Sequence, residues 1–80
     1  MKMNVEELIK QAKLLLNENK LEEAKTVFEN ILKIEPSHYK THTNIGAILL
    51  KLEKFKEAMK SFEKAIELNP NFVIAHYNLG

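Results

Sequence analysis

Histidines carry the most obvious chemistry in this 80-residue chain. His38 and His42 are four residues apart, a spacing at which two imidazoles on one helix face can bind the same zinc ion. No third ligand of the right kind follows at a matching spacing, and the chain has no Cys. His42 also recurs as His76, 34 residues later, which is typical of a repeated structural position. The sequence therefore predicts no metal site.

Nucleophilic catalysis has equally little support. A Ser–His–Asp set is impossible because the chain has no Asp, and neither Ser37 nor Ser61 lies in a nucleophile-elbow motif. All 11 acidic residues are Glu and all 12 basic residues are Lys. Many of them, such as Glu53 and Lys56, are three or four residues apart, which is typical of a solvated helix surface. We predict that the chain is not an enzyme and binds no cofactor.

The composition is that of a helix-rich globular domain, with 45% hydrophobic and 29% charged residues and only two Gly and two Pro. The net charge is +1, and without Arg the chain lacks the fork of donors that binds phosphates and base edges, so nucleic acid is not an expected partner. The N-terminal residues do not resemble a signal peptide, and no apolar run approaches the roughly 18 residues of a membrane span. We expect a cytoplasmic protein without membrane contact.

The sequence repeats itself with a period of 34 residues. HTNIG at 42–46 returns as HYNLG at 76–80. The identical pairs further include Leu15 and Leu49, Ala24 and Ala58, Phe28 and Phe62, and Pro36 and Pro70. This periodicity divides one domain, residues 1–80, into repeat 1 (5–38), repeat 2 (39–72) and a truncated repeat 3 (73–80).

Each complete repeat is predicted to form two helices, because apolar residues recur at spacings of three and four in both halves. In repeat 2 these are Ile45, Ile48, Leu49 and Leu52, then Phe55, Ala58, Met59, Phe62, Ala65, Ile66 and Leu68. The Pro of each repeat ends its second helix, and Asn4 and Ser37 are expected to cap the helices that follow them.

Two positions in the hairpins are unusual. Asn19 and Glu53 share the turn slot, which often needs a left-handed residue; Asn tolerates that conformation, whereas Glu53 is expected to cost about 1 kcal/mol. Gly46 lies inside a predicted helix, where Gly costs about 0.5–1 kcal/mol relative to Ala. Its presence implies a close approach of the second helix, and we expect Ala58 to face it.

A 34-residue helix–turn–helix unit with this pattern resembles the tetratricopeptide repeat (TPR). The residues that carry the resemblance in repeat 2 are NIG at 44–46, Leu49, Ala58, Phe62, Ala65 and Pro70. It implies an all-α fold in which antiparallel helix–turn–helix repeats stack as a short right-handed α-solenoid. The chain departs from the family at three positions that favour a large aromatic residue, occupied here by Leu8, His42 and His76.

The resemblance also implies a function, that of a protein-interaction module or scaffold. First helices of the repeats line a concave groove in this family, which holds an extended peptide or a partner's helix. The expected groove residues are Lys10, Lys13, Asn17, Lys40, Thr43, Asn44, Ala47, Lys51, Tyr77 and Asn78. Four of them are Lys, against the neighbouring Glu6, so an acidic protein or peptide partner is favoured.

Asn44 and Asn78 occupy the same slot in successive repeats, and Lys10 occupies it in repeat 1. A carboxamide offers both donors and an acceptor, which matches a peptide backbone without reading its side chains. Some members of the family hold extended peptides in this way. The alternative is that each Asn only hydrogen-bonds a neighbouring helix, and the sequence does not decide between the two.

Residues 73–80 begin a third repeat that the chain does not complete. Val73, Ile74, Tyr77 and Leu79 would form an open apolar edge, where each aliphatic side chain is worth about 1.5–3 kcal/mol if buried. Either the chain is part of a longer array, or two copies cover each other's edges in a homodimer. Structural self-association through this edge is therefore the alternative function.

Overall fold

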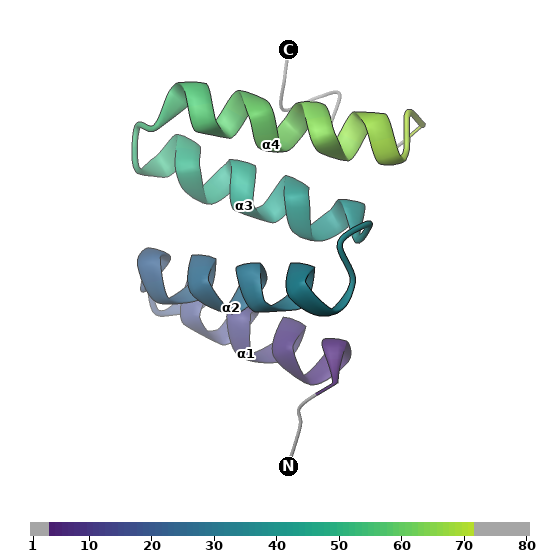
Figure 1. The fold of residues 1–80 in the computed structure, drawn as a ribbon. Helices are drawn as coiled ribbons and strands as arrows, with labels where there is room; N and C mark the ends of the chain where they lie inside the picture. Colours follow the sequence, from purple (N-terminus) through teal and green to yellow (C-terminus); the bar gives the residue numbers. More distant parts are fainter. Residues whose placement is uncertain (1–3, 72–80) are drawn as a thin grey trace. The chain divides into compact units, whose positions relative to one another are not determined.

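Residues 4–71 are described by a computed structural model and form four helices, α1 (Val5–Asn17), α2 (Leu21–Ile34), α3 (Tyr39–Lys51) and α4 (Phe55–Leu68). These residues contain no strand, so the predicted all-α fold class is confirmed. The chain divides into two compact units, Met1–Pro36 and Ser37–Gly80. Each unit holds one antiparallel hairpin, α1 with α2 and α3 with α4 (Figure 1).

The helix ends follow the sequence signals closely. Asn4 caps α1, because its side-chain Oδ1 accepts a hydrogen bond from the Glu7 N–H at 2.9 Å. The second helices end at Ile34 and Leu68, two residues before Pro36 and Pro70. Proline disfavours the α conformation in the residue before it, which accounts for both ends.

The predicted cap of α3 is wrong by one residue. The capping position is His38 and not Ser37, and its carbonyl accepts the Thr41 N–H at 3.0 Å. The His38 Nδ1 and the Thr41 Oγ1 share a hydrogen bond of 2.7 Å, while the His38 side chain makes no capping bond to the backbone. Thr41 is fully buried, so this bond gives its hydroxyl a partner that it would otherwise lack.

Both hairpin turns use the same backbone device. Asn19 and Glu53 have φ angles of 61°, in the left-handed region, as the sequence predicted. The N–H of the next residue reaches back to the helix it leaves, from Lys20 to the Leu15 carbonyl at 2.9 Å and from Lys54 to the Leu49 carbonyl at 2.8 Å. This is a Schellman motif, which satisfies carbonyls at the helix end.

The turns are short because one residue serves two helices. Lys20 closes the end of α1, and its carbonyl also accepts the Ala24 N–H in the first turn of α2 at 3.0 Å. Lys54 does the same between α3 and α4, through the Ala58 N–H at 3.0 Å. No residue is left over for a flexible loop, so each pair of helices is held at a fixed crossing.

An aromatic ring lies at the centre of each hairpin. In the first unit Phe28 is buried with Leu8, Ala12, Ala24 and Ile31. In the second unit the buried apolar residues are Ile45, Gly46, Ile48, Leu49, Ala58, Phe62 and Ala65. The small residues at equivalent slots let the helices approach, and Phe28 and Phe62 are the largest of the fully buried side chains.

Gly46 is required by a close approach of α4, as its place inside a helix predicted, and the nearest atoms belong to Phe62. A Cβ atom added at Gly46 would lie 2.7 Å from Cε1 and 2.9 Å from both Cδ1 and Cζ of Phe62. The ring of Phe62 therefore occupies the space that a side chain at this position would need. This close approach is the physical reason for a glycine inside α3.

Candidate functional site

Five predicted groove residues lie on α3, at spacings of three and four that put them on one face of the helix. Lys40 and Lys51 are exposed near its two ends, and Asn44 and Ala47 are half-buried between them. Two cations thus flank a small, partly sheltered amide and methyl surface. Such a surface can donate and accept hydrogen bonds at its centre and attract negative charge at its ends.

Asn44 has its carboxamide unused within the part of the chain that the structure describes. Among residues 4–71 its side chain makes no hydrogen bond, although other polar side chains of α3 do. It is not fully buried, so the amide remains accessible from solvent. Of the two interpretations of Asn44, hydrogen bonding to a neighbouring helix finds no support in these residues.

Thr43 does not suit the groove-lining role predicted for it, because it is buried. Only 4% of its surface is exposed, and its hydroxyl donates to the carbonyl oxygen of Tyr39 within α3 at 3.2 Å. A threonine can hide its hydroxyl in this way because the partner lies one turn back on its own helix. Thr43 is therefore removed from the set of ligand-facing residues.

On α1 the predicted residues are Lys10, Lys13 and Asn17, which also share one face of their helix. All three are exposed, and within residues 4–71 none of them has an ion pair or a side-chain hydrogen bond. They are free to meet a ligand. The remaining predicted residues, Val73, Ile74, Tyr77, Asn78 and Leu79, lie outside the described residues.

The histidine pair does not form a metal centre in the region that the structure covers. No group of three His, Cys, Asp or Glu side chains gathers within residues 4–71. The Nδ1 of His38 is instead directed to the Thr41 hydroxyl. Its role is to complete the start of α3.

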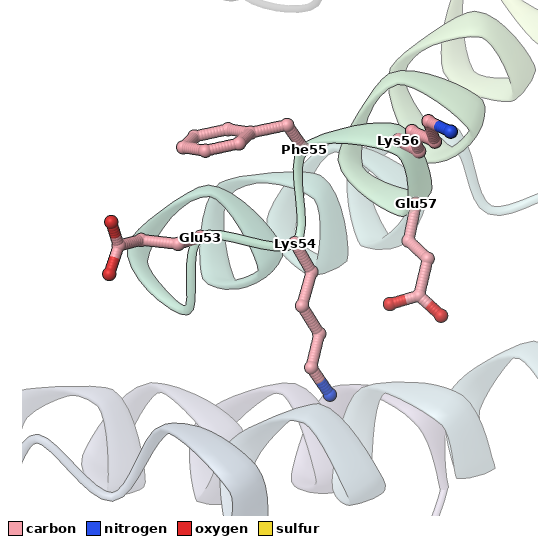
Figure 2. A pocket seen from close by; sticks show the side chains of 5 residues that line it. All are labelled: Glu53, Lys54, Phe55, Lys56 and Glu57. Carbon is pink, nitrogen blue, oxygen red and sulfur yellow. The ribbon is translucent and has the colours of Figure 1, made fainter.

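Sequence reasoning missed a surface at the junction of α3 and α4. It assigned Phe55 and Met59 to the apolar face of the helix, but 58% and 46% of their surfaces are exposed. They lie at the edge of the stripe formed by Ala58, Phe62 and Ala65, so the spacing alone could not reveal their exposure. An open hollow of about 490 Å³ adjoins Phe55 and is lined by residues 53–57, whose side chains spread in different directions (Figure 2).

Comparison with known families identifies the fold. Two profiles described as tetratricopeptide repeat match the chain, one over residues 8–38 and one over residues 39–72. The chain belongs to the TPR family. The two matches lie within repeats 1 and 2, and the family is one of protein-interaction scaffolds.

Solved TPR structures resemble the chain along most of its length. YrrB, a TPR protein with an unusual peptide-binding site, is 26% identical with a TM-score of 0.88, over 92% of this chain and 38% of YrrB. The TPR2B domain of yeast Sti1, solved in complex with pHsp70, is 32% identical with a TM-score of 0.86, over 92% of this chain and 59% of that one. These neighbours confirm an all-α helical-repeat solenoid. No curated protein matches the sequence.

This TPR chain spans less than two thirds of the length of both of these structures. None of its helices within residues 4–71 is long and apolar enough to cross a membrane.

Proposed function

We propose that this chain is a TPR protein-interaction module that binds an extended, acidic peptide along the polar faces of its first helices. The observation that carries the proposal is the state of Asn44, which is half-buried and whose side chain makes no hydrogen bond within residues 4–71. A sheltered amide with free donors and an acceptor is suited to a peptide group, because both partners then exchange water for a direct bond.

Cations favour an acidic segment over a basic one. Lys40 and Lys51 stand at the two ends of the α3 face, and Lys10 and Lys13 stand on α1, all exposed and without ion pairs among the described residues. Their attraction for carboxylates acts through solvent, so it should fall as salt is added. That the α1 and α3 faces line one groove remains a prediction of the family resemblance.

The experiment begins with peptides selected for binding to the whole chain from a random display library. Their dissociation constants are then measured by fluorescence anisotropy on the parent chain and on Asn44→Ala and Lys13→Glu. Losing one or two hydrogen bonds at Asn44 should weaken binding about tenfold. Lys13→Glu should weaken acidic peptides at low salt and have less effect at high salt.

Lys33→Glu is the matched control, because Lys33 is an exposed lysine in the last turn of α2 and is not among the predicted groove residues. If binding is as strong in Asn44→Ala and Lys13→Glu as in the control, the proposed site is wrong. The alternative, a homodimer through Val73, Ile74, Tyr77 and Leu79, is tested by light scattering over a wide concentration range. A monomer at every concentration would exclude it.

A further inference from the structure

Repeats 1 and 2 share a backbone but differ sharply in the chemistry of their hairpin corners. We define the α3–α4 corner as residues 52–60, which correspond to residues 18–26 in the first unit. Residues 52–60 contain three Lys and two Glu, whereas residues 18–26 contain two Lys and three Glu. The net charge therefore changes sign between two corners that have the same turn geometry.

The lysines of the first corner have partners. Lys20 forms an ion pair with Glu18 at 3.7 Å, and Lys25 forms one with Glu29 at 3.4 Å. In the second unit Leu52 replaces Glu18 and Met59 replaces Lys25. Nothing in the fold of a hairpin requires these exchanges, because the first unit forms the same turn without them.

The lysines of the α3–α4 corner lack such partners. Within residues 4–71, Lys54, Lys56 and Lys60 are exposed and have no ion pair. Lys56 and Lys60 follow Phe55 and Met59 directly in the sequence, so about 100° around the helix separates each cation from its apolar neighbour. Lys56 and Lys60 are one helical turn apart, so their ammonium groups would lie on the same side of a ligand bound along Phe55 and Met59.

Phe55 supplies the apolar part of this surface. Its ring extends from the start of α4 away from Lys56, beside the hollow lined by residues 53–57 (Figure 2). Leu21, at the same slot in the first unit, is smaller and half-buried. Phe55 and Met59, one turn apart and each about half exposed, form a ridge that could gain from burial by a partner's apolar side chain.

We propose that the α3–α4 corner is a second binding surface, distinct from the faces of the first helices, and that it takes an acidic segment of a partner protein carrying a large apolar side chain. The apolar side chain covers Phe55 and Met59, and carboxylates beside it meet Lys56 and Lys60. Charge complementarity selects this occupant, because the corner's three exposed lysines outnumber the exposed Glu53 and Glu57 and its net positive charge favours an acidic segment over a basic one.

The probe is a labelled synthetic peptide, Glu-Asp-Leu-Glu-Phe-Leu-Glu-Asp, compared with a counterpart in which Lys replaces every acidic residue. Binding to the full chain is measured by anisotropy, and its location by amide chemical shifts. We expect the acidic peptide alone to bind, with shifts concentrated in residues 52–60 and affinity falling with salt. Shifts confined to the α1 and α3 faces, equal binding of both peptides, or no binding would each overturn the proposal.

Matched variants separate the corner from its surroundings. Lys56→Glu with Lys60→Glu should weaken the acidic peptide about tenfold or more at low salt, whereas Lys20→Glu, at the first corner, should change it less than about twofold. Phe55→Ser should also abolish binding while the melting temperature stays near that of the parent, because the ring is mostly exposed. If the acidic peptide binds Lys56→Glu with Lys60→Glu, and Phe55→Ser, as tightly as the parent, the assignment is overturned. Asn44→Ala, which tests the other site, should leave the affinity for this peptide unchanged.

Two other occupants give different results in the same experiments. A second copy of the chain would give a concentration-dependent dimer in light scattering that Phe55→Ser converts to a monomer. Residues 72–80 of the same chain would give nuclear Overhauser contacts to the Phe55 ring without peptide. Either result would overturn the proposed partner.

Discussion

Replacing Gly46 by alanine tests how tightly α3 and α4 are held together. By helix propensity alone the change should stabilise α3 by about 1 kcal/mol. The new Cβ, however, would lie 2.7–2.9 Å from three carbons of the Phe62 ring, where ordinary contacts are about 3.5–4.0 Å. Phe62 is only 1% exposed, so the ring has no solvent to move into.

Relieving such an overlap costs typically about 1–3 kcal/mol in displaced side chains and backbone. Subtracting the propensity gain predicts that Gly46→Ala lowers the free energy of unfolding by roughly 0–2 kcal/mol. The assay is urea unfolding followed by far-ultraviolet circular dichroism. Ala12→Gly, at the same slot of α1, is the companion variant and should destabilise by about 1–2 kcal/mol, because both helix propensity and a fully buried methyl group are lost.

A double-mutant cycle identifies the ring as the cause. When Phe62→Leu removes the ring, Gly46→Ala should become stabilising by about 0.5–1 kcal/mol, because only the propensity term is left. The same effect in both backgrounds would show that the overlap is not with Phe62. A Gly46→Ala variant more stable than the parent would refute the reasoning, since the helices would then be free to separate.

Three smaller predictions concern the turns and caps, and all are measured as free energies of unfolding. Glu53→Gly should stabilise by about 1 kcal/mol because its φ is 61°, whereas Asn19→Gly should change stability by less than about half of that. Asn4→Ala should destabilise by about 1 kcal/mol through loss of the α1 cap; an unchanged value would mean that α1 frays there. Thr41→Val should cost about 1 kcal/mol, since its buried hydroxyl bonds His38, while Thr26→Val, at an exposed hydroxyl, should cost much less.

The elements and turns could be predicted from sequence because their causes are local. A proline fixes where the second helices end, Asn4 caps the helix that follows it, and the slot shared by Asn19 and Glu53 sets the left-handed turn residue. Each of these depends on residues within about one helical turn. Because equivalent residues recur 34 positions later, the second unit forms the same helices and turn as the first.

The errors arose where contacts across helices decide the outcome. Spacing places Gly46 on the face toward α4, but the separation of 2.7–2.9 Å between an added Cβ and the Phe62 ring comes from the structure alone. The same angular pattern put Phe55 and Met59 in the core, although they lie just beyond the covered stripe. Thr43 is polar yet buried, because its own helix satisfies its hydroxyl. Periodicity gives the angular position of a residue around its helix, but not how much of the helix surface the neighbouring helix buries.

Comparing the two repeats separates fold from function within one chain. Both units have the same Schellman motif, the same φ angle at the turn and a buried Phe at the same position. These shared features therefore cannot distinguish what the two repeats bind. The differences are confined to side chains that the hairpin does not need. Lys10 is replaced by Asn44 on the first helices, and the charge of the corner changes sign. At that slot the two first helices therefore differ in chemistry, with a cation on α1 and, on α3, an amide that makes no side-chain hydrogen bond within residues 4–71.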